Sequence, residues 1–207
     1  MQQAEAVEHK SKSPVKNRYP YFFESINDIL SMLSSDPDSS LTEFYSTGDK
    51  ADLRRMRPGV QEQRPFAFWR LLSRYGVLHD ITTGKKSYLT PDEESKWVAV
   101  IQGMAMTADL CHNAKYDFGE ALGYCEPSED ALTKRFDQLL RATPERFVDL
   151  LHHMLKLLIS KDCAFNWDSL AALILTPSER ERNVLLSRLA QSYYGTREKA
   201  RFASENK

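Results

Sequence analysis

The sequence contains, at residues 143–160, the stretch TPERFVDLLHHMLKLLIS. Thr143 can cap a helix with its hydroxyl group, and Pro144 suits the first turn because it needs no amide partner there. Apolar residues follow with the period of an α-helix, so they share one face. They are Phe147, Leu150, Leu151, Met154, Leu155 and Leu158. The stretch therefore predicts an amphipathic helix from about Pro144 to Ser160 in a helical bundle.

Two further Thr-Pro pairs predict helix starts of the same kind. Thr90-Pro91 is followed by Glu93, and Thr176-Pro177 is followed by Glu179, so each pair can form a capping box. The predicted helices cover about 91–110 and 177–194. We expect the first of them to be amphipathic as well, with Trp97, Ile101 and Met104 on its apolar face.

Weaker patterns predict shorter helices elsewhere, and no segment alternates convincingly as a strand. Their expected ranges are 20–33, 41–45, 65–75, 117–122, 129–141 and 167–174. The predicted fold is all-α, with two small helical bundles and eight or nine helices in total. The expected domains are a mobile polar tail at 1–18, an N-terminal helical domain at 19–125, a C-terminal helical bundle at 126–196 and a polar tail at 197–207.

The composition is that of an ordinary soluble protein, since 42% of the 207 residues are hydrophobic and 28% are charged. No apolar run approaches the roughly 20 residues of a membrane span. The N-terminus lacks the hydrophobic core of an export signal. We therefore expect a cytoplasmic chain with no membrane partner. Cys111, Cys125 and Cys163 show no CxxC spacing and are expected to be reduced thiols.

Catalytic groupings are missing from the sequence. The neighbouring His152 and His153 would point about 100° apart on a helix, so they cannot easily ligate one metal ion. The acidic run at 92–94 is better explained by the favourable effect of anions at a helix N-terminus. No Ser or Cys nucleophile lies in a recognisable setting. We expect a protein without catalytic activity, metal or cofactor.

Residues 48–58 (GDKADLRRMRP) concentrate four cations in a chain with a net charge of −1. On a helix, Lys50, Arg54 and Arg57 would share one stripe, whereas Arg55 would point elsewhere. Such a stripe has two interpretations. It is either a solvated helix face relieved by Asp49 and Asp52, or a clamp for phosphate groups.

Charge is also distributed in zones along the chain. Residues 48–78 and 131–161 are basic, and the acidic segment 79–130 separates them. Long cationic side chains neutralise phosphates without reading a base sequence, so both zones are candidate nucleic-acid surfaces. Besides the cations of 48–58, the candidates are Arg70, Arg135, Arg141, His152, His153 and Lys156. The nearly neutral total argues against strong binding by the free protein, because such binding depends on many released counterions.

Several motifs, taken in order, resemble CasB, the small subunit of the type I-E CRISPR surveillance complex Cascade. They are GDKADLRR (48–55), FWRLL (68–72), FGEAL (118–122), a Ser-Glu, Arg and Leu-Leu pattern over 128–140, NWDSLA (166–171) and the aromatic helix at 189–194. Each motif is weak alone, but the ordered set covers residues 48–194. One departure is that His152 and His153 stand where family members often carry paired arginines.

The resemblance implies a two-domain helical protein that pairs with a second copy of itself. The pair would lie beside the backbone subunits that carry the crRNA and near the large subunit of the complex. There it would stabilise the R-loop by holding the target and displaced DNA strands, without catalysis. Matched residue by residue, the family motif assigns phosphate contact first to Arg55, then to Arg54 and Lys50, and secondarily to Arg135.

Two other classes of function are compatible with the sequence alone. A helical scaffold could use the charged faces to contact acidic proteins, with no nucleic acid involved. A metal-dependent nuclease would instead need clustered carboxylates beside a basic groove, and the sequence does not show that pattern.

Overall fold

The computed structural model describes residues 14–35, 44–60, 63–79, 83–111, 114–125 and 130–205. Within these ranges the regular structure is helical, and the only extended pairings are isolated bridges of His79 with Lys86 and of Asp117 with Asn166. The helices are α1 Pro14–Arg18, α2 Pro20–Glu24, α3 Ile26–Leu33, α4 Thr47–Arg55, α5 Phe66–Arg74, α6 Pro91–Cys111, α7 Phe118–Cys125, α8 Asp130–Leu140, α9 Pro144–Ser160, α10 Asp168–Leu175 and α11 Glu179–Glu205. The all-α prediction is confirmed, with more helices than expected.

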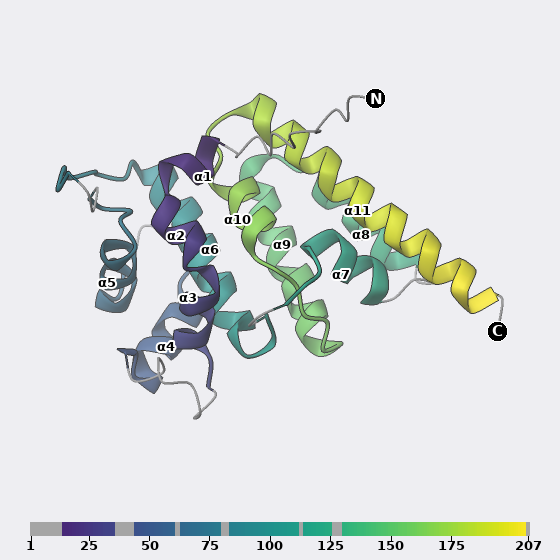
Figure 1. The fold of residues 1–207 in the computed structure, drawn as a ribbon, viewed down its shortest axis with the longest axis horizontal. Coiled ribbons are helices and arrows are strands. Elements are labelled where there is room, and N and C mark those ends of the chain that lie inside the picture. The colour runs from purple at the N-terminus through teal and green to yellow at the C-terminus, as the bar shows by residue number, and fades with distance from the viewer. Residues whose placement is uncertain are drawn as a thin grey trace, which may run out of the picture.

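Helix α6 is the centre of the fold. Every residue from Trp97 to Ala105 is buried, so this part of the helix has no solvent-facing side. Helices α3 and α4 pack against it, and so do α9 and α10. In Figure 1 these neighbours lie around α6, with α5 at one end of the molecule and α11 at the other. The prediction of an amphipathic α6 was therefore wrong, because the helix is enclosed on all sides.

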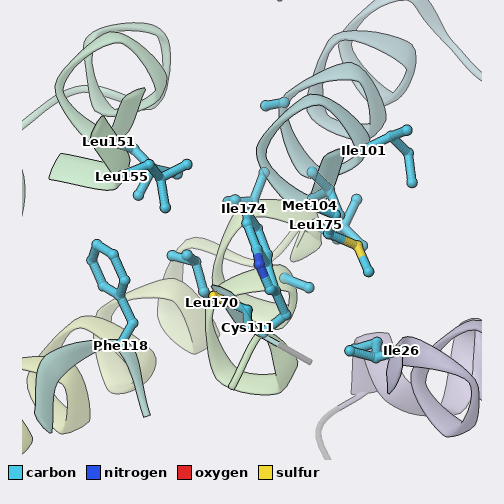
Figure 2. Close-up of a cluster of buried hydrophobic side chains, with 14 of the residues drawn as sticks. Ile26, Ile101, Met104, Cys111, Phe118, Leu151, Leu155, Leu170, Ile174 and Leu175 are labelled. Carbon is cyan, nitrogen blue, oxygen red and sulfur yellow. The ribbon is translucent and has the colours of Figure 1, made fainter. Parts of the chain in front are cut away.

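One apolar core connects elements from both halves of the chain. Figure 2 shows Ile26 of α3 and Ile101 of α6 in the same cluster as Leu155 of α9 and Leu170 of α10. At the other end of α6, Tyr19 and Phe22 make edge contacts with Trp97 at ring-centroid distances of 5.1 and 4.7 Å. The division into domains near residue 125 stays a prediction, and the packing around α6 crosses it.

Trp167 attaches the start of α10 to α6. Its ring lies so close to Gly103 that a Cβ atom there would collide with it. The indole Nε1–H donates to Thr107 Oγ1 at 2.9 Å, and this hydroxyl donates to the Gly103 carbonyl at 3.0 Å. A fully buried Trp therefore has its one polar group satisfied, as burial requires.

Helices α7 and α11 approach each other closely through two glycines of α7. A Cβ atom on Gly119 would lie 2.7 Å from the Leu189 carbonyl oxygen, and one on Gly123 would lie 2.8 Å from that of Tyr193. Because both obstacles are backbone atoms, no side-chain movement would remove the clash. The two glycines lie four residues apart, so they face α11 together.

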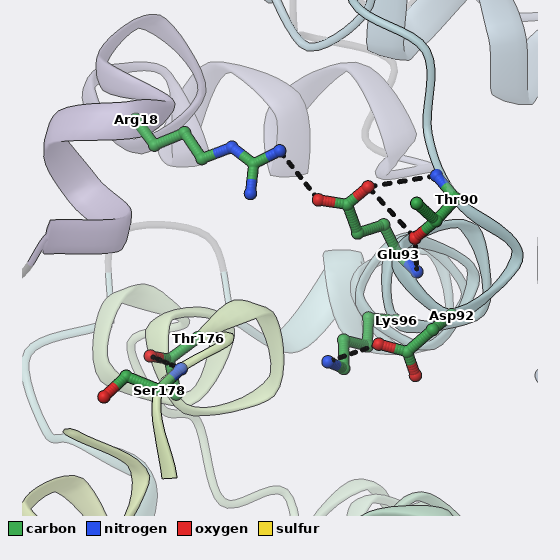
Figure 3. A network of polar contacts seen from close by, with 7 residues as sticks. All are labelled: Arg18, Thr90, Asp92, Glu93, Lys96, Thr176 and Ser178. Atoms are coloured by element: carbon green, nitrogen blue, oxygen red, sulfur yellow. Dashed lines mark hydrogen bonds and ion pairs between the residues drawn. The ribbon is translucent and has the colours of Figure 1, made fainter. Parts of the chain in front are cut away.

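The capping residues predicted the starts of some helices correctly and the start of another incorrectly. Thr90 and Glu93 form a reciprocal capping box at the start of α6, and Arg18 donates to Glu93 at 2.7 Å (Figure 3). Helix α9 begins at Pro144 and ends at Ser160 as predicted, but the expected cap from the Thr143 hydroxyl is not formed, so Pro144 alone marks this start. Helix α11, however, begins at Glu179, because Thr176 donates to Glu181 and Ser178 Oγ accepts the Glu181 amide.

Other boundaries also differ from the prediction. The helix predicted at 20–33 is interrupted at Ser25, which divides it into α2 and α3. Helix α11 continues past Tyr194 to Glu205. Residues 14–18 form α1, in which Val15 is buried, while residues 1–13 and most of the helix predicted at 41–45 lie outside the described residues. Among the helices described, none is both long enough and apolar enough to cross a bilayer.

The close contact of α7 with α11 predicts a specific loss of stability. We expect Gly119→Ala and Gly123→Ala each to lower the free energy of unfolding by about 1–3 kcal/mol, because the added methyl group overpacks a backbone contact. Urea unfolding followed by circular dichroism would measure this.

Gly195→Ala is the matched control, because a Cβ atom at Gly195 of α11 meets nothing within 4 Å. This substitution should be neutral or should stabilise the chain by up to about 1 kcal/mol through helix propensity. Equal effects at all three glycines would contradict the packing explanation.

Candidate nucleic-acid interface

Helix α4 carries the first basic zone, and its start is fixed by local hydrogen bonds. Ser46 Oγ accepts the Asp49 amide at 3.1 Å, and Asp49 Oδ2 accepts the Ser46 amide at 3.0 Å, which completes a capping box. Asp49 also accepts a hydrogen bond from Arg70 of α5 at 3.2 Å. The Asp49 carboxylate therefore takes part in the N-terminal cap of α4 and also connects this helix to α5.

Lys50 is directed into the protein. Its side chain is buried, and its ammonium group donates to the carbonyl of Ser34, the residue that follows α3. A cation at this place stabilises the partial negative charge of a helix C-terminus. Burial lowers the pKa of Lys50, opposed by Asp109 and assisted by Arg54. Lys50 thus has a structural role here. Its ammonium group is not exposed for the phosphate contact that the sequence predicted.

Arg54 is also largely engaged within the chain. Its Nε–H donates to the Ala105 carbonyl of α6 at 2.7 Å, and its guanidinium lies 3.6 Å from the Asp109 carboxylate. In return, the Gln102 side chain donates to the Arg54 carbonyl at 3.3 Å. Two of the three cations on the predicted stripe therefore hold α4 against α3 and α6.

Arg55 and Arg57 are the exposed cations at the end of α4. The Arg55 side chain is 77% exposed, and within the part of the chain that the structure describes it forms an ion pair only with Asp52 at 3.6 Å, itself an exposed residue of the same helix. Arg57 is exposed just after the helix, where its backbone carbonyl accepts a hydrogen bond from Arg64. Surface pairs of this kind contribute little stability, so the Arg55 guanidinium can exchange Asp52 for a phosphate at small cost.

Arg70 and Arg74 extend the basic zone onto α5. Arg70 lies over the Tyr45 ring at 4.6 Å, and Arg74 lies over the exposed Phe44 ring at 4.1 Å. Stacking on aromatic rings orients both guanidinium groups, and Arg70 is in addition paired with Asp49 at 3.2 Å. Arg74 was left out of the sequence-based candidates, although its spacing of four residues from Arg70 placed the two on one face.

The second basic zone lies on α8 and α9. Arg135, Arg141, His153 and Lys156 are exposed, and they have no ion pair within the described residues. His152 is half-buried. Burial lowers its pKa, and the neighbouring Lys156 and His153 lower it further. Asp149 opposes this lowering, but burial outweighs it, so the His152 ring is a weaker cation toward a phosphate than an ordinary histidine.

The two zones occupy different parts of the molecule. Helix α4 and helix α8 lie on opposite sides of the view in Figure 1, with α6 and α9 between them. The structure thus brings Arg55, Arg57 and Arg70 to one basic zone and Arg135, Arg141 and Lys156 to another. Among the residues described, no group of three or more His, Cys, Asp or Glu side chains could hold a metal ion.

Residues 49–194 match the family described as CRISPR-associated protein Cse2. The match covers more than half of the 207 residues and includes both basic zones. No curated protein and no solved structure matches the chain significantly.

The Asp49 contacts predict a pH-dependent stability. Although burial works in the opposite direction, hydrogen bonds from Ser46 and Arg70 lower the pKa of Asp49 below 3.8. Its stabilisation is therefore fully present above the unfolded-state value of 3.8 and is lost as the pH falls through the lower folded-state value. We expect Asp49→Asn to reduce the free energy of unfolding by about 1 kcal/mol at pH 7.

Urea unfolding of the wild-type chain and the variant between pH 7 and pH 3 would check this. The difference in the free energy of unfolding between the wild-type chain and Asp49→Asn should narrow only at the acidic end of this range. Asp52→Asn, which removes an exposed carboxylate from the same helix, should show no such trend. A constant difference for Asp49→Asn across the range would show that its charge is not involved.

Proposed function

This chain belongs to the family of CRISPR-associated protein Cse2, the CasB family of the type I-E Cascade complex, and we propose that it stabilises the R-loop of that complex by binding DNA through its basic helix faces. In an R-loop, the guide RNA pairs with the target strand and the second DNA strand is displaced. Base pairing reads the sequence, so a protein that holds these strands needs only contacts to the phosphate backbone.

The exposure of Arg55 carries this proposal. Of the three cations that the family motif assigns to phosphate, Lys50 is buried and Arg54 bonds to α6, whereas Arg55 is largely exposed. The two inward cations fix α4 in place, and Arg55 and Arg57 then project from a rigid helix end. Preorganised cations lose less conformational entropy when they bind than cations on a flexible segment would.

Arg70 and Arg74 broaden the same contact. Arg70 is held by Asp49 near the start of α4, and Arg55 lies about 9 Å further along the helix axis. That separation is comparable to the spacing of phosphates along one or two nucleotides of a strand. The zone on α8 and α9 is proposed as a second, weaker contact, made by Arg135, Arg141 and Lys156.

The remaining parts of the proposal concern partners. We infer that the chain acts without catalysis, cofactor or membrane, in the cytoplasm, and that it pairs with a second copy of itself. The backbone and large subunits would position it beside the crRNA and both DNA strands. A net charge of −1 supports this dependence on neighbours, because the chain alone has few excess cations with which to bind DNA.

Neutralising the exposed cations tests the proposal directly. In the reconstituted complex, Arg55→Gln together with Arg57→Gln should shorten the lifetime of the R-loop by about tenfold or more at moderate salt. Removing two phosphate contacts should also reduce the steepness of the salt dependence by about 1.4–1.8 in the log-log slope. Dissociation of labelled target DNA over a salt series would measure both.

Arg180→Gln with Arg188→Gln is the matched control, since it removes the same charge from exposed positions of α11. It should leave the lifetime within about twofold of wild type if binding depends on local contacts. An R-loop unaffected by the Arg55 and Arg57 changes would instead favour a protein scaffold that does not contact nucleic acid.

A further inference from the structure

The end of the molecule formed by α5 exposes two large aromatic side chains. Phe66 is 88% exposed and Tyr88 is 83% exposed, more than any other large hydrophobic residue described. Helix α5 stands at one edge of the fold in Figure 1, away from α11. Single exposed apolar residues are common on protein surfaces, but a group of them beside a cavity indicates an interaction site.

Such a cavity lies beside Tyr88. A pocket of about 470 Å³ is lined by Trp69, Leu78, Tyr88 and Leu89, with Lys86 and Glu94 among its polar residues. Trp69, Leu78 and Leu89 are only partly buried, and they pack against the core from outside. Phe66 precedes Trp69 by three residues on α5, so the two share a side of the helix. The core-facing side is formed by Ala67, Phe68, Leu71 and Leu72.

Two lysines stand at this pocket. Lys86 lines it and Lys85 is its neighbour in the sequence, and neither has an ion-pair partner among the residues described. Among the described residues of the wall the carboxylate is Glu94, which already accepts a hydrogen bond from the nearly buried Arg64 at 2.8 Å. Lysines without an ion pair in the described part of the chain thus lie next to an apolar hollow.

We propose that Phe66, Trp69 and Tyr88 form a docking surface for another protein, which inserts an apolar side chain into the pocket and places a carboxylate beside Lys85 or Lys86. Aromatic side chains around a pocket are typical of the anchoring positions of protein interfaces. The apolar, concave lining favours an apolar protein side chain over a phosphate-bearing strand. This surface is distinct from Arg55 and Arg57, so it does not depend on the proposed DNA contacts.

A site-specific cross-link tests the proposal in the assembled complex. Tyr88 would be replaced by the photoreactive residue benzoylphenylalanine, which an 83% exposed position accepts without repacking. We expect a cross-link to another subunit, within a segment that has an apolar residue and an Asp or Glu about one helical turn apart. A cross-link to a second copy of this chain, to nucleic acid or to a segment without a carboxylate would overturn the proposal, as would no cross-link.

A pair of variants supplies the energetic test. Phe66→Ser with Tyr88→Ser should reduce retention of the chain in the purified complex by about tenfold or more. Tyr116→Ser with Tyr124→Ser is the matched control, because it removes two exposed aromatic residues elsewhere, and its retention should equal that of wild type. The proposal would be contradicted if the Phe66 and Tyr88 variant stayed in the complex as well as the wild-type chain does. It would also be contradicted if both double variants were lost from the complex to the same extent. The Arg55 and Arg57 variant should keep the Tyr88 cross-link, which separates this surface from DNA binding.

Discussion

Helix α6 has no solvent-facing side between Trp97 and Ala105, so each neighbouring helix must supply either apolar surface or a partner for its polar groups. Gly103 makes room for the Trp167 ring, and Thr107 satisfies the indole N–H at 2.9 Å. Arg54 of α4 donates a hydrogen bond to the Ala105 carbonyl of α6. Enclosure of one helix thereby fixes the positions of α3, α4, α9 and α10, because a gap at any of them would expose apolar surface to water.

This enclosure also divides the cations of α4 into two groups. Lys50 and Arg54 hold α4 against α3 and α6, and the burial of Lys50 is tolerable only because its ammonium group finds an oxygen partner. Arg55 and Arg57, which lie at the end of the same helix, are left exposed on a rigid support. The proposed DNA contact thus depends on two structural cations, Lys50 and Arg54, that are bonded within the protein.

The sequence predicted helix ends well where one capping group had no competitor. Thr90 with Glu93 located α6, and Pro144 located the first turn of α9, although the Thr143 side chain makes no capping hydrogen bond. Ser178, two residues after Thr176, took over the capping of α11. Periodicity identified the residues that share a helix face but not the direction of that face. The stripe of Lys50, Arg54 and Arg57 was therefore recognisable, while the inward orientation of Lys50 was not. Enclosure of α6 was equally hidden, because it depends on segments distant in the sequence.

The central claim is that a helix held by Lys50 and Arg54 presents Arg55 and Arg57 to nucleic acid. An electron cryomicroscopy structure of the assembled complex with bound target DNA tests it most directly. The proposed function predicts the Arg55 guanidinium within about 3 Å of a phosphate oxygen, with Lys50 still bonded to the Ser34 carbonyl. A structure in which Arg55 and Arg57 both face protein or solvent, with the DNA strands elsewhere, would contradict it.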